Sequence, residues 1–144
     1  MKKFLLEPQD ILPGIELEHE SGKLKFYGKS CPANAHEFYS PVFEWIDNYL
    51  ENPSENTVLE LYLSYFNTLS AKIILNIMYK METLSKSGKK VAIRWIYQEN
   101  DEILKEAGED FDKIVDVKFE FIAVQNNEDD SDEEERIDNL LNNM

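Results

Sequence analysis

Hydroxyl side chains stand between an expected strand and an expected helix, in the segment Asn67-Thr68-Leu69-Ser70. Residues 58–66 alternate as a strand does, and residues 71–84 carry apolar side chains at helical spacing. The first turn of a helix offers unpaired backbone N–H groups and the positive end of the helix dipole. A phosphate on a hydroxyl there would be tolerated locally, and it would add negative charge to an exposed rim. The segment is therefore a candidate phosphorylation site.

The alternative is that these residues only cap the helix. Asn, Ser and Thr are the usual N-cap residues, because their side-chain oxygens accept hydrogen bonds from the first free N–H groups. On the motif alone, capping by Asn67, Thr68 or Ser70 is the more common explanation. Both interpretations stay open on the residue pattern.

Other groups that could do chemistry are few. His19 and His36 lie in different expected elements, and neither has a metal-ligand spacing with the single cysteine. The five glycines are scattered as turn residues rather than gathered in a phosphate-binding loop. Glu99, Asp101 and Glu102 mark a helix start, where acids suit the dipole; a catalytic carboxylate pair or a divalent-ion site is the alternative. We expect no enzymatic activity, no metal and no cofactor.

Composition narrows the class of protein further. A chain of 144 residues suits one domain with a sizeable core. Its net charge of −14 argues against nucleic acid or an anionic membrane as partner. There is no apolar run of membrane-spanning length, and the N-terminus has no cleavage-site pattern. Cys31 is alone, which fits a reducing compartment, so we expect the protein in the cytoplasm without membrane insertion.

A β-hairpin is expected near the N-terminus. Residues 15–20 and 23–28 both alternate, and Ser21-Gly22 between them suits a two-residue turn. Such a turn would place opposite charges on one face and apolar groups on the other. The predicted register pairs Glu20 with Lys23, Glu18 with Lys25, and Leu17 with Phe26.

A first helix is expected over about 33–50, with a core stripe of Phe38, Val42, Trp45, Ile46 and Tyr49. Pro41 lies inside this span, so either the helix kinks there or its regular part begins near residue 40. Tyr39, Phe43 and Leu50 lie partly off the stripe. A wide buried face is the simpler explanation, and an apolar patch for a partner is the alternative.

Alternating strands and helices continue along the chain, with strands at 91–97 and 117–124 and a short helix at 100–109 that ends near Gly108. Phe119 and Phe121 are expected to point inward. This order predicts parallel crossovers. Because the strands alternate, we expect an α/β fold with a mixed sheet, helices on one face and a polar second face. The residues expected on that polar face are Glu16, Glu18, Lys23, Lys25, Glu60, Arg94, Lys118 and Glu120, with Glu60 and Arg94 as candidate cross-strand partners.

Residues 1–125 thus form one expected domain, followed by an acidic segment at 126–144. That segment holds eight acids against Arg136 alone, a net charge of −7. Such a composition is typical of a disordered, solubilising tail. The alternative is a short docking turn that uses Ile137, Leu140 and Leu141.

Residues 61–72 contain an aromatic residue, then Asn67-Thr68-Leu69-Ser70, then Lys72. The segment resembles the central motif of the SiaC family of bacterial regulatory phosphoproteins, which shows an aromatic residue, Asn-Thr-Ser-Ser and a lysine on the following helix. Leu69 stands where the family usually has serine. The resemblance covers about 57–121 well, the hairpin more loosely and the tail not at all. Further matching features are Pro32, Glu37-Phe38, Pro41, Trp45, the strand at 91–97, Asp101-Glu102 and Gly108-Glu109.

This resemblance implies a STAS-like fold and a non-enzymatic switch in cyclic di-GMP signalling. In the family, a Ser/Thr kinase of anti-sigma-factor type phosphorylates a threonine of the motif, and a metal-dependent Ser/Thr phosphatase removes the phosphate. The unphosphorylated form binds and activates a diguanylate cyclase; another signalling effector is possible here. The implied acceptor is Thr68, with Ser70 as the alternative. The alternative function is a constitutive interaction or scaffold domain in which Thr68 only caps the helix. The residues expected to contact a partner are Asn67, Leu69, Ser70, Lys72, Tyr39 and Phe43.

Overall fold

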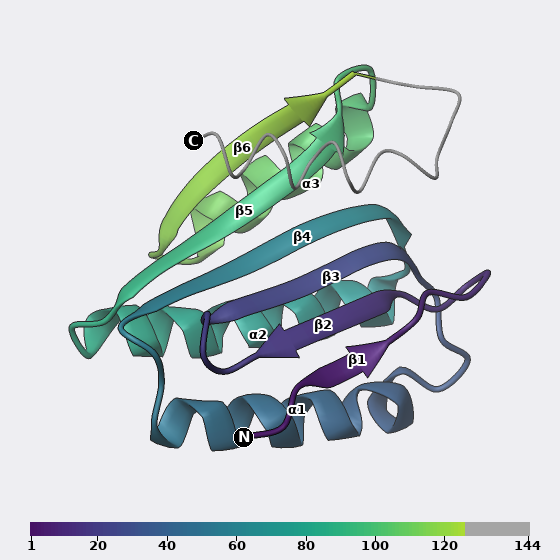
Figure 1. Ribbon diagram of the computed structural model, residues 1–144. Helices are drawn as coiled ribbons and strands as arrows, with labels where there is room; N and C mark the ends of the chain where they lie inside the picture. Colours follow the sequence, from purple (N-terminus) through teal and green to yellow (C-terminus); the bar gives the residue numbers. More distant parts are fainter. Residues whose placement is uncertain (126–144) are drawn as a thin grey trace.

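A six-stranded mixed sheet forms the centre of the molecule, with its strands in chain order from β1 to β6 (Figure 1). The computed structural model describes residues 1–125. Strands β1, β2 and β3 pair antiparallel, and β3 to β6 pair parallel through the helices α1, α2 and α3. The elements are β1 Phe4–Leu6, β2 Gly14–Glu18, β3 Lys23–Ser30, α1 Ala35–Glu51, β4 Asn56–Phe66, α2 Thr68–Lys86, β5 Lys90–Gln98, α3 Glu102–Ile114 and β6 Lys118–Val124. The predicted mixed sheet is confirmed, and β1 is an addition to it.

The core lies between the helices and one face of the sheet. Leu59, Leu61 and Ile93 of the central strands are buried against α1 and α2, as the alternation predicts. The opposite face carries the predicted charged residues. Glu60 lies opposite Arg94 in the register, but the Arg94 Nε–H donates to Glu120 Oε2 at 3.0 Å instead. The one-sided layering is confirmed, and the expected pairing of Glu60 with Arg94 is replaced by one with β6.

The N-terminal hairpin forms with a different register. Glu18 pairs with Lys23 and Leu17 with Leu24, a shift of two residues from the predicted pairing. The connection is longer than two residues and runs from His19 to Gly22. Within it the Gly22 N–H donates to the carbonyl of His19, and Gly22 takes a positive φ of 71°. The Gly22 carbonyl also accepts from Val58 N–H at 2.8 Å, which joins the turn to β4. A slip of two residues leaves every side chain on its predicted face.

Two helices differ from their predicted bounds. Helix α1 begins at Ala35, capped by Asn34, and continues through Pro41 without ending there. Its buried face includes Tyr39, while Phe43 and Leu50 are partly buried against the core, as a wide buried face predicts. Helix α3 does not end near Gly108 but continues to Ile114. Gly108 instead lies close against the sheet, since an added Cβ would clash with the Trp95 indole.

The last strand also departs from expectation in part. Phe119 packs against the core as predicted, whereas Phe121 is exposed at the edge of the sheet. The expected disordered tail and its docking turn at 126–144 lie outside the described residues. In the described part of the chain, no helix is both long and apolar enough to cross a bilayer.

Candidate functional site

The end of β4 contains a register shift that decides which side chains face outward. Leu63 pairs with Gly28 and Tyr65 with Lys29, so Ser64 is an extra residue in β4. A bulge of this kind reverses the alternation beyond it. Phe66 consequently turns toward the core, with its ring 6.1 Å from that of Trp95, while Tyr65 is 56% exposed. The packed Phe66 ring fixes the position of the residue that follows it, Asn67.

Asn67 is the N-cap of α2. Its backbone is extended, and its side-chain oxygen accepts from the Ser70 N–H at 2.9 Å. Capping by Asn67 is therefore confirmed, and capping by Thr68 is wrong. Thr68 is the first residue of the helix and is exposed. The helix needs the Asn67 side chain for its cap, and it leaves the Thr68 hydroxyl available at its N-terminus.

Matched alanine substitutions test this assignment. We expect Asn67→Ala to lower the free energy of unfolding by about 1 kcal/mol, because the cap hydrogen bond is lost. Thr68→Ala should change it by less than about 0.5 kcal/mol, as exposed surface substitutions usually do. Urea denaturation followed by circular dichroism measures both. A larger loss in Thr68→Ala than in Asn67→Ala would contradict the assignment.

Ser70 lies on the inner side of the same helical turn. It is fully buried, and the Ser30 hydroxyl donates to its Oγ at 2.8 Å. Ser30 Oγ in turn accepts from the Tyr39 hydroxyl at 2.7 Å, so the end of β3, α1 and the start of α2 meet in one chain of buried hydroxyls. A kinase cannot reach Ser70 unless α2 opens. The structure thus separates the two candidate acceptors, with Thr68 outside and Ser70 inside.

The predicted partner contacts divide in the same way. Tyr39 is 1% exposed and Ser70 is buried, so neither can touch a partner in this conformation, and that expectation is wrong for both. Phe43 is half-buried against the core, with the Lys80 ammonium 5.6 Å from its ring centroid. Leu69 is 46% exposed and Lys72 is exposed. We call the exposed residues Tyr65, Thr68, Leu69 and Lys72 the Thr68 rim.

Two features of this site went unrecognised in the sequence. Ser30 lies beyond the predicted strand at 23–28, and nothing local marks it as a partner of α2. The exposure of Tyr65 had a visible signal, since apolar residues recur at Leu59, Leu61 and Leu63 and then only at Phe66. A change of spacing from two to three residues is what a bulge produces.

Burial raises the pKa of the Tyr39 hydroxyl to about 12, and the hydrogen bond with Ser30 opposes only part of that rise. An unfolded tyrosine has a pKa near 10. As pH rises between these two values, the unfolded chain releases this proton while the folded chain keeps it. The contribution of the buried phenol to stability is therefore complete below about pH 10 and is lost as pH rises toward about 12.

Alkaline denaturation tests this linkage. We expect the free energy of unfolding to fall by up to about 2–3 kcal/mol between about pH 9 and pH 12 on account of Tyr39. Tyr39→Phe removes the ionisable group, so its stability should fall less steeply over that interval. Urea titrations of both proteins at several pH values give the comparison. Parallel pH profiles would show that Tyr39 titrates like an exposed tyrosine.

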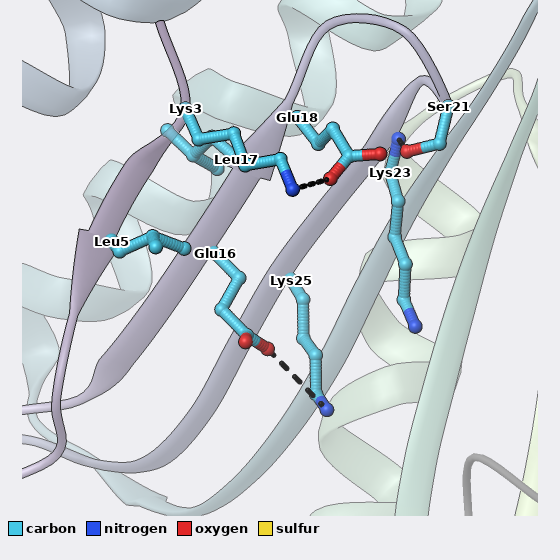
Figure 2. A pocket seen from close by; sticks show the side chains of 8 residues that line it. All are labelled: Lys3, Leu5, Glu16, Leu17, Glu18, Ser21, Lys23 and Lys25. Carbon is cyan, nitrogen blue, oxygen red and sulfur yellow. Dashed lines mark hydrogen bonds and ion pairs between the residues drawn. The ribbon is translucent and has the colours of Figure 1, made fainter.

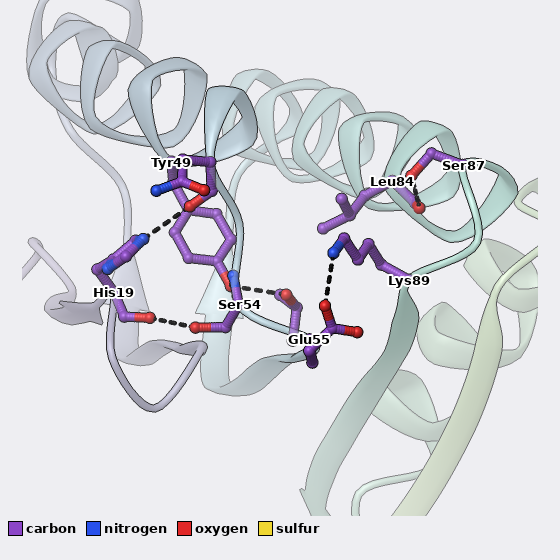
Figure 3. A network of polar contacts seen from close by, with 9 residues as sticks. His19, Tyr49, Ser54, Glu55, Leu84, Ser87 and Lys89 are labelled. Carbon is purple, nitrogen blue, oxygen red and sulfur yellow. Dashed lines mark hydrogen bonds and ion pairs between the residues drawn. The ribbon is translucent and has the colours of Figure 1, made fainter.

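A second polar network lies at the other end of the sheet (Figure 3). The His19 Nε2–H donates to the Asn52 carbonyl at 2.7 Å, and the His19 ring packs edge-on against Tyr49. The Ser54 hydroxyl donates to the His19 carbonyl, while Lys89 pairs with Glu55 at 2.8 Å and holds the pKa of that carboxyl below its usual value. These contacts tie the hairpin to the loops after α1 and α2, which is a structural role.

The acidic group at the start of α3 also has a structural explanation. Asp101 is the N-cap of α3, where its carboxylate accepts from the Leu104 N–H at 3.0 Å. Glu102 lies in the first turn, favourably placed for the helix dipole. Among residues 1–125, no group of three or more His, Cys, Asp or Glu side chains is arranged to hold a metal ion. The start of α3 therefore explains Asp101 as its cap and Glu102 as a first-turn acid.

This chain is similar to one known protein family over most of its length. The model of the SiaC family of regulatory phosphoproteins matches residues 6–124, which is most of the chain. The chain belongs to the SiaC family. A SiaC-family assignment agrees with the site, since the motif 67–70 stands at the strand-to-helix junction and presents an exposed threonine.

A curated relative and solved structures of SiaC are also similar to this chain. An uncharacterized protein of Pseudomonas aeruginosa is 31% identical over 99 residues, covering 69% of this chain and 79% of the relative. The crystal structure of apo-SiaC from Pseudomonas aeruginosa has a TM-score of 0.80 and 27% identity, covering 85% of this chain and all of that one. SiaC in complex with the diguanylate cyclase SiaD, which it activates, has a TM-score of 0.80 and 27% identity over 84% of this chain and 99% of that one.

Proposed function

We propose that this protein is a phosphorylation-controlled binding module without catalytic activity, and that Thr68 is its phosphate acceptor. One observation carries the proposal. In a single helical turn, Thr68 is exposed at the first position of α2 while Ser70 is buried and hydrogen-bonded to Ser30. Only one of the two hydroxyls in the motif is available to a kinase in the folded protein.

The charge of a phosphate explains how the switch works. Phosphorylation of Thr68 adds about −1.5 to −2 charges at neutral pH. The helix N-terminus stabilises that charge, so the fold is retained. The Thr68 rim changes character, because its exposed Tyr65 and Leu69 now flank a strongly hydrated dianion. A partner that buries this rim would have to desolvate the phosphate, so binding weakens.

The proposal for the effector is supported by a relative. Because SiaC of Pseudomonas aeruginosa is the activator of the diguanylate cyclase SiaD, we propose a diguanylate cyclase as the effector here. The unphosphorylated form binds and activates it. By family resemblance, a Ser/Thr kinase of anti-sigma-factor type adds the phosphate and a metal-dependent Ser/Thr phosphatase removes it. We propose that all of these steps take place in the cytoplasm.

Phosphosite mapping tests the choice of acceptor. The protein is purified from its native cells with phosphatase inhibitors present, and its phosphopeptides are sequenced by mass spectrometry. We expect phosphate on Thr68 and none on Ser70, since only the former is exposed. A phosphate on Ser70 would show that the α2 N-terminus opens for the kinase. An absence of phosphate under every growth condition would favour a constitutive scaffold.

A further inference from the structure

The sheet face opposite the helices, which we call the open face, carries charged side chains that are almost inaccessible to solvent. No described helix packs on it, yet Glu60 is fully buried and Lys25 is 3% exposed. Strands with one uncovered face usually leave such charged side chains in water. The lysines here line a shallow pocket of about 450 Å³ over β1, β2 and β3 (Figure 2). The low exposure of Glu60 and Lys25 is typical of a sheet face that a further layer of the protein covers.

A small apolar cluster lies at the other side of the same face. Ile96, Ile122 and Val124 are each less than one-tenth exposed, and Tyr62 packs against them. The cluster is separate from the main core, and the alternation of the strands places it on the face that also carries Arg94 and Glu120. The open face therefore carries a buried apolar cluster next to charged side chains.

The chain leaves the sheet at this cluster. Val124 is the last residue of β6, so the segment 126–144 begins beside it. Lys23 of β3 lies three strand spacings across from β6, about 14 Å, and six residues back along the strands from Val124, about 20 Å. The acids at 128–138 can reach over this distance of about 25 Å when the chain that leads to them is extended, at about 3.3 Å per residue. The segment's Ile137, Leu140 and Leu141 recur at the spacing of one helical face, and its eight acids provide carboxylates for lysines.

We propose that the acidic C-terminal segment, residues 126–144, docks on the open face of its own sheet. Ile137, Leu140 and Leu141 meet the cluster around Ile122, and the acids lie near Lys23 and Lys118, whose side chains are 40% and 71% exposed. The SiaC-family match ends at residue 124, so this segment is an addition to the shared domain. It covers the open face and excludes other partners from it. The proposal does not depend on Thr68.

Zero-length cross-linking of the full-length protein tests the docking. A carbodiimide joins lysines to carboxylates in direct contact, and mass spectrometry maps the products in a mixture of isotopically labelled and unlabelled protein. We expect the acids of 126–144 to couple within one molecule to Lys23 and Lys118 several times more often than to Lys72 or Lys105 on the helix side. An even spread over these lysines, or coupling only between labelled and unlabelled copies, would overturn the proposal.

A variant in the segment completes the test. Ile137→Ser, Leu140→Ser and Leu141→Ser together should remove the preference for Lys23 and Lys118, because the apolar contact is lost while every acid remains. The matched control changes exposed isoleucines on α3, with Ile103→Ser and Ile114→Ser, and should keep the preference. A preference that persists in the triple-serine variant would overturn the proposed apolar anchor.

Discussion

Thr68→Glu should lose the effector, whereas Thr68→Ala should retain it at close to the wild-type level. The glutamate places a permanent charge in the Thr68 rim between Tyr65 and Leu69, both exposed. An unpaired charge buried at an interface costs about 2–5 kcal/mol, so we expect roughly a 30-fold or greater loss of affinity. Pull-downs from native lysate with the three proteins as baits, read by mass spectrometry, identify the effector, and titration with it gives the affinities.

A control separates the position of the charge from its sign. Asn76→Glu adds the same charge on an exposed position of α2, two turns beyond Thr68. It should bind the effector as the wild type does. Equal binding by wild type, Thr68→Ala and Thr68→Glu would mean that Thr68 lies outside the interface. Equal losses in Thr68→Glu and Asn76→Glu would point to the net charge of the protein instead.

Trp95→Ala should produce the largest loss of stability. The indole is 1% exposed, its N–H donates to the Leu104 carbonyl at 2.8 Å, and its ring contacts Phe66 and Phe111. Truncation would leave a cavity between β5 and α3, so we expect a loss of about 3–5 kcal/mol. Domains of this size have about 5–15 kcal/mol in total. Chemical denaturation measures the effect.

The milder substitution Trp95→Phe distinguishes packing from hydrogen bonding. It keeps a ring against Phe66 but removes the indole donor to the Leu104 carbonyl and shrinks the ring, so a loss of about 1–3 kcal/mol is expected. A Trp95→Ala variant within about 1 kcal/mol of wild type would show that α3 is not anchored through this residue. Together the two variants measure how much the contact of Trp95 with α3 contributes to the free energy of unfolding.

Much of the fold was predictable because the strands alternate so regularly. Glu60, Arg94 and Glu120 alternate with Leu59 and Ile93, which are buried, and with Phe119, which is half-buried against the core; this pattern alone implies a sheet with helices on one face. The strand-to-helix junction at 67–70 was equally clear from the change of period. Local pattern therefore predicted the place of the candidate site.

Other features depended on contacts that local sequence does not encode. The turn of the hairpin is linked through Gly22 to Val58, which lies 36 residues away. Gly108 resembles a helix end in sequence, yet it serves close packing on Trp95. The burial of Ser70 depends on Ser30 from another strand. Each of these was misjudged or missed because the deciding partner is distant along the chain.

The affinity of the phosphorylated protein for its effector is the most direct test of the proposed switch. Protein carrying a phosphate on Thr68 alone, made by kinase treatment and verified by mass spectrometry, is titrated against the captured diguanylate cyclase beside unmodified protein, with cyclase activity recorded in parallel. We predict that unmodified protein binds and activates the cyclase and that the Thr68 phosphate abolishes both effects while the circular dichroism spectrum is unchanged. Equal binding and activation by the two forms would contradict the account.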